Sequence, residues 1–122
     1  MAQTEVFLYQ DEEGAIPLRV WLDEQPRKVQ DKCIAKISRL AELGNELRRP
    51  EVDFLRDGIY ELRASYQGVH YRMPYFFAGK AVVVLSHGLT KERAVPLREI
   101  DTAIRRKRQV EGDFKKFAVK PR

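Results

Sequence analysis

The chain has very little cysteine and no long apolar run. Cys33 is its only cysteine among 122 residues, which excludes an internal disulfide and a cysteine-based zinc site. No segment comes near the roughly 20 consecutive apolar residues that a membrane-spanning helix needs. The N-terminus also lacks the basic start, apolar core and small-residue cleavage site of a secretion signal. These absences predict a soluble, cytoplasmic protein that does not bind membranes.

Basic charge is concentrated at the C-terminus. The formal net charge is +5. Residues 98–122 hold nine of the 23 Lys and Arg side chains but only four of the 18 Asp and Glu side chains. The rest of the chain is therefore neutral overall. Such a distribution indicates an anionic partner, nucleic acid first, although basic tails that only keep a protein soluble are common.

The hydrophobic pattern predicts a single α+β domain over residues 1–122. From the N-terminus we expect a strand at 5–9, a helix from Pro17, an amphipathic helix from Pro26 to Gly44, strands at 59–66, 69–78 and 81–89, and a basic helix from Pro96 to Gly112. Residues 45–58 are expected to form a loop, and residues 113–122 a flexible basic tail. This order predicts a mainly antiparallel sheet packed against the two N-terminal helices.

Two short connections define the expected register of the last three strands. Residues 67–68 and 79–80 each leave two residues between strands, which predicts consecutive antiparallel hairpins. In this register Arg63 faces Arg72, and Arg72 faces His87. Like charges directly opposed across a strand pair repel each other. We therefore expect something of opposite charge beside them.

Further polar side chains extend this row. They are Glu61 and Ser65 beside Arg63, His70 opposite Ser65, and Lys91 and Arg93 just after the last strand. The row has too few acids of its own to neutralise it, and a phosphodiester fits because the arginine fork matches phosphate oxygens. The alternative is that Arg63 and Arg72 are solvated residues of a half-exposed sheet, with Glu61 as an ion-pair partner.

The same groups are suited to RNA cleavage through the ribose 2′-hydroxyl. Arginine and lysine would stabilise the charge of the pentacoordinate phosphorus. Such cleavage needs positioning, charge stabilisation and proton transfer, but no metal ion or cofactor. The candidates for proton transfer are Glu61, His70, His87 and Tyr60, and the sequence does not choose among them.

Four segments from about Leu55 to Lys107 carry a resemblance: "DGIYELR", "YRMPYFF", "VVVLSHGLTKE" and "PLREIDTAIRRK". In this order they resemble the RelE/ParE superfamily of bacterial toxins, most closely its HigB-like branch of phage-derived, host-killing proteins. The resemblance implies a RelE-like fold and a type II toxin that cuts mRNA on the ribosome without a metal. It also implies a HigA-like helix-turn-helix antitoxin, with operator DNA bound only through the antitoxin complex.

The resemblance implies roles for individual residues. Arg63, Arg72 and Lys91 match basic residues assigned to scissile-phosphate binding and transition-state stabilisation. Contacts to RNA are expected from a second set of residues: Glu61, His87, Arg93, Arg105 and Arg106.

The chain also departs from the family pattern. Leu89 replaces an aromatic residue, Glu92 a basic one, and Leu97 the functional tyrosine of RelE. These departures leave the proton-transfer group open and allow an inactive RNA-binding relative. A ParE-like toxin, which poisons DNA gyrase without enzymatic activity, is the other alternative.

Overall fold

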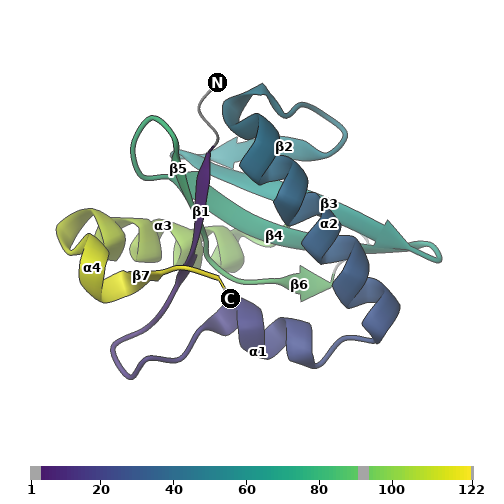
Figure 1. The fold of residues 1–122 in the computed structure, drawn as a ribbon, viewed down its shortest axis with the longest axis horizontal. Coiled ribbons are helices and arrows are strands. Elements are labelled where there is room, and N and C mark those ends of the chain that lie inside the picture. The colour runs from purple at the N-terminus through teal and green to yellow at the C-terminus, as the bar shows by residue number, and fades with distance from the viewer. Residues whose placement is uncertain (1–3, 91–93, 122) are drawn as a thin grey trace.

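The computed structural model describes residues 4–90 and 94–121 (Figure 1). Its elements are, in chain order, β1 (Glu5–Tyr9), α1 (Pro17–Asp23), α2 (Arg27–Leu43), the 3₁₀ turn η1 (Gly44–Glu46), β2 (Val52–Arg56), β3 (Ile59–Tyr66), β4 (Val69–Phe77), β5 (Val82–Leu85), β6 (Leu89–Thr90), α3 (Leu97–Gly112), α4 (Phe114–Phe117) and β7 (Ala118–Val119). Among these residues no helix is both long and apolar enough to cross a bilayer.

The described strands form one mostly antiparallel sheet. Their order is β2-β3-β4-β5-β1-β7, and the short β6 also pairs with β4. β1 and β5 run parallel, whereas the other paired strands run antiparallel. This confirms an α+β fold that is consistent with the RelE-like arrangement.

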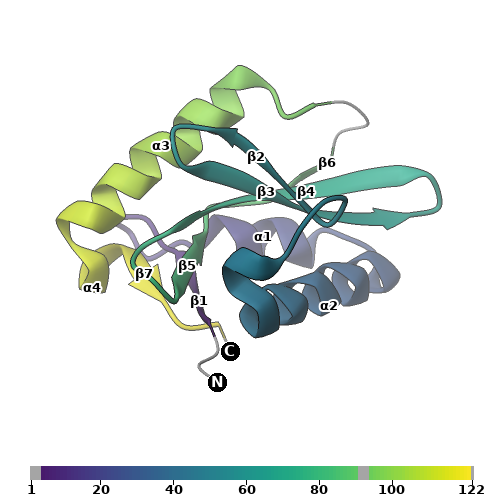
Figure 2. The same ribbon diagram turned by 90° about the horizontal axis from the view of Figure 1, so that it is seen from above.

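Helices cover both faces of the sheet. In Figure 2, α1 and α2 lie on one side and α3 lies on the other. Successive side chains along a strand point to opposite faces of the sheet, so each strand contributes to the core on both faces. Leu62 and Met73 pack into the core under α1 and α2, whereas Ile59 and Phe76 pack into the core under α3. The basic helix α3 therefore forms a separate layer.

The helix ends and the first hairpin agree with the sequence prediction. Pro26 and Pro96 directly precede the first residues of α2 and α3, and α2 ends before Gly44. Gln67 and Gly68 both have positive φ, as the tight turn between β3 and β4 requires. The pairing places Arg63 opposite Arg72, as predicted.

The predicted register of the second hairpin is wrong. Ala78 donates its N–H to the carbonyl of Val82 at 2.8 Å, so the turn inside this pair has three residues, 79–81, where the sequence predicted two; β4 itself ends at Phe77 and β5 begins at Val82. β5 then ends at Leu85, and β6 places Leu89 opposite Arg72. His87 therefore does not face Arg72, because one extra residue in the connection and the break after Leu85 both shift the register.

The structure differs from the sequence prediction in two further segments. Part of the expected loop at 45–58 forms β2, which turns into β3 through Asp57 and Gly58, both at positive φ. The expected flexible tail forms α4 and β7, and β7 pairs with β1. Phe117 is buried there, which gives the segment an apolar anchor.

Candidate functional site

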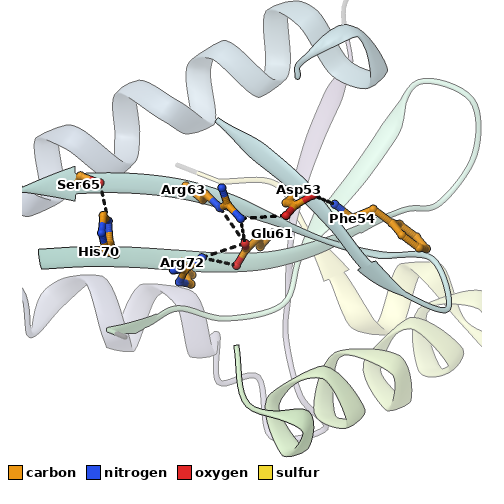
Figure 3. A network of polar contacts seen from close by, with 7 residues as sticks. All are labelled: Asp53, Phe54, Glu61, Arg63, Ser65, His70 and Arg72. Carbon is orange, nitrogen blue, oxygen red and sulfur yellow. Dashed lines mark hydrogen bonds and ion pairs between the residues drawn. The ribbon is translucent and has the colours of Figure 1, made fainter. Parts of the chain in front are cut away.

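Glu61 lies between the two opposed arginines (Figure 3). Its carboxylate accepts from Arg63 Nε at 2.8 Å and from Arg72 Nη1 at 2.9 and 3.1 Å. The Glu61 side chain is only 2% exposed. A shared carboxylate thus stabilises two guanidinium groups that would otherwise repel each other across the strand pair.

A second carboxylate comes from β2. Asp53 Oδ2 accepts from Arg63 Nη2 at 3.0 Å, and its other oxygen accepts from the backbone N–H of Phe54. The prediction that the row lacks enough acids is therefore wrong for the described residues. It failed because β2 was expected to be loop, although Asp57-Gly58 is a recognisable hairpin signal.

Arg72 keeps hydrogen-bonding capacity within this network. Its ion pair with Glu61 uses Nη1. Its buried Nε has no partner among the residues that the structure describes. Buried donors in proteins are nearly always paired, so an unpaired one calls for an acceptor. The guanidinium is held in place by Glu61, and its Nε is shielded from solvent.

The two arginines line a groove of about 380 Å³ beside the end of the β3–β4 hairpin. We call it the arginine groove; its lining residues are Lys32, Lys36, Pro50, Glu51, Arg63, Ala64, Ser65, His70 and Arg72. Lys32 and Lys36 come from α2, one turn apart on its polar side. The sequence prediction missed both lysines. Their four-residue spacing on the predicted helix was the available signal.

The acidic member of the groove is strongly neutralised. Glu51 accepts from Arg39 at 2.5 and 2.8 Å and from Lys36 at 3.2 Å. Hydrogen bonding to Arg39, followed by that to Lys36, lowers the pKa of Glu51 to about 2. Such a carboxylate stays ionised near neutral pH and is a weak proton acceptor.

His70 stands at the hairpin end of the groove. Its Nδ1 is 2.9 Å from Ser65 Oγ, and both residues are exposed. The predicted pairing of Ser65 with His70 is confirmed. The contact orients the imidazole ring and leaves Nε2 without a protein partner among the described residues.

The remaining predicted residues lie elsewhere or outside the described chain. Lys91 and Arg93 fall outside the described residues. Arg105 is exposed on α3 and does not line the arginine groove. Arg106 is half-buried against the ring of Tyr9, whose centroid is 4.8 Å from the guanidinium carbon.

His87 belongs to a separate polar cluster under α3. Its Nε2 is 2.8 Å from Glu99 Oε1, and its Nδ1 is 2.7 Å from Ser86 Oγ and 3.3 Å from Arg106 Nη1. Burial, and then the positive charge of Arg106, lower the pKa of His87, while Glu99 opposes this shift. Ser86 is fully buried and His87 nearly so. This cluster therefore ties α3 to the sheet instead of contacting the arginine groove.

The model of one protein family matches residues 20–108, which include every lining residue of the arginine groove. The family is described as phage-derived protein Gp49-like (DUF891). The chain belongs to this family. Gp49-like proteins fall within the RelE-like toxin–antitoxin group and are associated with its toxins, which implies an antitoxin partner. No curated protein matches the chain significantly.

Proposed function

We propose that this Gp49-like protein is a HigB-like toxin that cleaves mRNA on the ribosome without a metal ion. The observation that carries the proposal is the pair of opposed arginines, Arg63 and Arg72, which Glu61 holds together at one wall of a basic groove. Two fixed guanidinium groups suit a phosphodiester better than a point charge does, because each offers a planar set of donors.

The proposed reaction uses the RNA's own nucleophile. The ribose 2′-oxygen forms a bond to phosphorus while the bond from phosphorus to the 5′-oxygen breaks. A base takes the proton of the 2′-hydroxyl, and an acid gives a proton to the departing 5′-oxygen. The products are a 2′,3′-cyclic phosphate and a 5′-hydroxyl, so neither water nor an external cofactor is consumed.

The arginines would act on the phosphorus centre. Extra negative charge builds on the non-bridging oxygens as the fifth bond forms, and donors held in place stabilise this charge without reorganising. Arg72 lines the groove and is held by the buried Glu61. Glu61 is thus proposed as a positioning residue that keeps both guanidinium groups directed at one phosphate.

We assign proton transfer to His70. Glu61 is a poor candidate because its carboxylate is almost fully buried and bound to two arginines. Tyr60 lines another groove, and His87 contacts α3. His70 lines the arginine groove, is exposed and has its ring oriented by Ser65. Imidazole is also the side chain most often used for general acid–base catalysis.

The antitoxin partner is proposed to be a HigA-like helix-turn-helix protein, through which the toxin would reach operator DNA. The antitoxin should cover either the arginine groove or the surface that enters the ribosome. Co-expression with the neighbouring short reading frame and purification of the complex would check this. Recovery of the chain alone would count against it.

One observation favours a second candidate, a ParE-like gyrase poison. Both arginines of the row are paired with carboxylates of the chain itself, so their charge is largely neutralised before RNA arrives. Arginines paired in this way can also serve only to stabilise the fold, in which case the row would not be a catalytic site. A gyrase poison would break DNA, induce the SOS response and leave mRNA intact.

Primer extension on a reporter mRNA after brief induction separates these candidates. Wild type should cut inside translated codons, and Arg63→Gln should remove the cuts. Arg19→Gln is the matched control, because it removes the same charge from an exposed site on α1 that does not line the groove. Cuts that persist in Arg63→Gln, with folding verified by circular dichroism, would contradict the proposal.

A further inference from the structure

A second groove lies along β2 and shares no lining residue with the arginine groove. We call it the aromatic groove; it has a volume of about 240 Å³ and is lined by Gly44, Asn45, Leu47, Arg48, Arg49, Val52, Asp53, Phe54, Tyr60, Tyr75 and Phe77. The segment from η1 to the start of β2 forms one wall, and the rings of β2, β3 and β4 form the other. Nothing in the family assignment gives this groove a role.

The aromatic wall is open to solvent at its edge. Phe54 is 54% exposed on the edge strand β2, which is unusual for a large apolar ring. Its centroid is 5.2 Å from that of Tyr60 in an edge-to-face arrangement, and Tyr60 stacks on Tyr75 at 5.5 Å. Packing between these rings holds them in fixed orientations. The wall is therefore a preformed surface on which a flat ring can stack.

The opposite rim is basic. Arg48 and Arg49 line the groove and are both exposed. Arg48 Nη1 donates to the carbonyl oxygens of Asn45 and Leu47, which holds its side chain against the turn. Two arginines facing aromatic rings provide charge for a phosphate and a face for a base, the combination that binds single-stranded nucleic acid.

The two grooves meet at Asp53. This residue lines the aromatic groove, and its carboxylate binds Arg63, which lines the arginine groove. Figure 3 shows Phe54 directed away from the arginine network, on the far side of Asp53. A strand that places a phosphate against Arg63 can therefore continue around the edge strand β2 to reach the rings.

We propose that the aromatic groove is a second RNA contact, which binds an unpaired base of the strand whose phosphate lies in the arginine groove. The inference rests on the proposed function, because it takes the substrate to be single-stranded RNA. The base stacks on the exposed ring of Phe54, with Tyr60 bordering it edge-to-face, and a neighbouring phosphate binds Arg48 and Arg49. The groove thereby selects unpaired nucleotides and sets which phosphate reaches Arg72.

Fluorescence anisotropy with a labelled single-stranded RNA of about eight nucleotides tests this directly. An abasic ribose-phosphate oligomer of the same length reports phosphate contacts alone. The variants are Phe54→Ala and Phe54→Leu, the latter retaining apolar packing without the ring. Val20→Ala is the matched control, because Val20 is 53% exposed but lies on α1, away from both grooves.

Both Phe54 variants should weaken binding of the RNA by roughly fivefold to a hundredfold, the range found for one stacked base. They should leave binding of the abasic oligomer unchanged, and Val20→Ala should alter neither. Arg48→Gln combined with Arg49→Gln should weaken binding of both oligomers and reduce the salt dependence.

Equal binding of the RNA by wild type and the Phe54 variants would overturn the inference, as would an equal loss for both oligomers. Loss of antitoxin binding with unchanged RNA binding would instead identify a protein-docking surface and overturn it as well. Binding that depends on Phe54, without any mRNA cleavage on ribosomes, would leave this contact standing and refute the proposed nuclease. The two proposals therefore fail separately.

Discussion

At the scale of single residues, Glu61 is the centre of the site. A buried carboxylate with two guanidinium partners is costly to disrupt, because removing one member leaves uncompensated buried charge. The sequence predicted the opposition of Arg63 and Arg72 and the presence of Glu61 beside them. It did not predict how completely Glu61 and Asp53 would pair with them.

A double-mutant cycle measures this bridge. Glu61→Gln and Arg72→Gln should each lower the free energy of unfolding. The double variant should lose less stability than the sum of the two single losses. We expect a coupling of about 1–3 kcal/mol between contacting residues of one network. Urea unfolding of the four proteins gives the value. Additive effects would show that Glu61 does not hold Arg72.

His87 should make stability depend on pH. Burial lowers its pKa in the folded state below the usual 6.5, so the unfolded chain binds a proton more readily. The contribution of neutral His87 to folding stability is therefore complete above about pH 6.5. It falls as the pH drops from there toward the lowered pKa of the folded state. The groups that face it are Ser86 on its own segment and Glu99 and Arg106 on α3.

The comparison is between wild type and His87→Gln, which cannot titrate. Unfolding in urea at pH 7.5 and pH 5.5 should show a larger loss of stability on acidification in wild type than in the variant. The difference between the two losses of stability reports the titration of His87, because the other titrating groups are common to both proteins. An identical loss in the two proteins would contradict the assigned environment.

At the scale of elements, the break between β5 and β6 depends on Gly88. A Cβ atom added there would lie 2.1 Å from Trp21 Cε3 in α1, well inside contact distance. Gly88→Ala must displace the indole ring or the strand, and we expect a loss of about 1–3 kcal/mol, the usual cost of overpacking. Thermal unfolding checks this.

Gly112→Ala is the control for that substitution. It lies at the end of α3, where a Cβ would meet nothing within 4 Å, so alanine there should be neutral or slightly stabilising. Equal stability of the Gly88→Ala protein and wild type would show that Trp21 does not pack against this segment as described.

The C-terminal segment should contribute to stability. Phe117 is buried in the core under α3, and the strand that follows it pairs with β1. Phe117→Ala should therefore cost about 3 kcal/mol, as for other buried phenylalanines. Lys115→Ala, an exposed neighbour, should change stability by less than about 0.5 kcal/mol. Equal effects would favour the flexible tail expected from sequence.

Particular elements show what the sequence could and could not predict. β1, the starts of α2 and α3, and the first hairpin follow from hydrophobic period, proline and the Gln67-Gly68 turn, which are local signals. The prediction for the second hairpin failed because a turn of three residues replaces the expected two, and because the segment after the break at Leu85 contacts Trp21 and α3, which are remote in sequence. The lysines of the groove were missed because they come from α2, remote in sequence from the strands.

At the scale of the whole molecule, helices on both faces leave the end of the β3–β4 hairpin projecting beyond the rest of the sheet (Figure 1). The arginine groove lies beside this end, with lysines contributed by α2. Glu61 and Arg63 alternate in phase with Ile59, so their side chains leave the sheet on the face that α3 covers. No residue of α3 lines the arginine groove, and Arg106 contacts Ser86 and His87. The described basic side chains of α3 therefore lie outside the lining of the arginine groove.

The central claim is that Arg72 binds the scissile phosphate as a fork of donors and not only as a charge. Single-turnover cleavage of ribosome-bound mRNA by Arg72→Lys, against Arg19→Lys as a charge-matched control on α1, tests it most directly. We predict that Arg72→Lys slows cleavage by about a hundredfold, the usual cost of losing one oriented donor to a transition state, while Arg19→Lys cleaves at the wild-type rate. Wild-type rates for a folded Arg72→Lys protein would contradict the account.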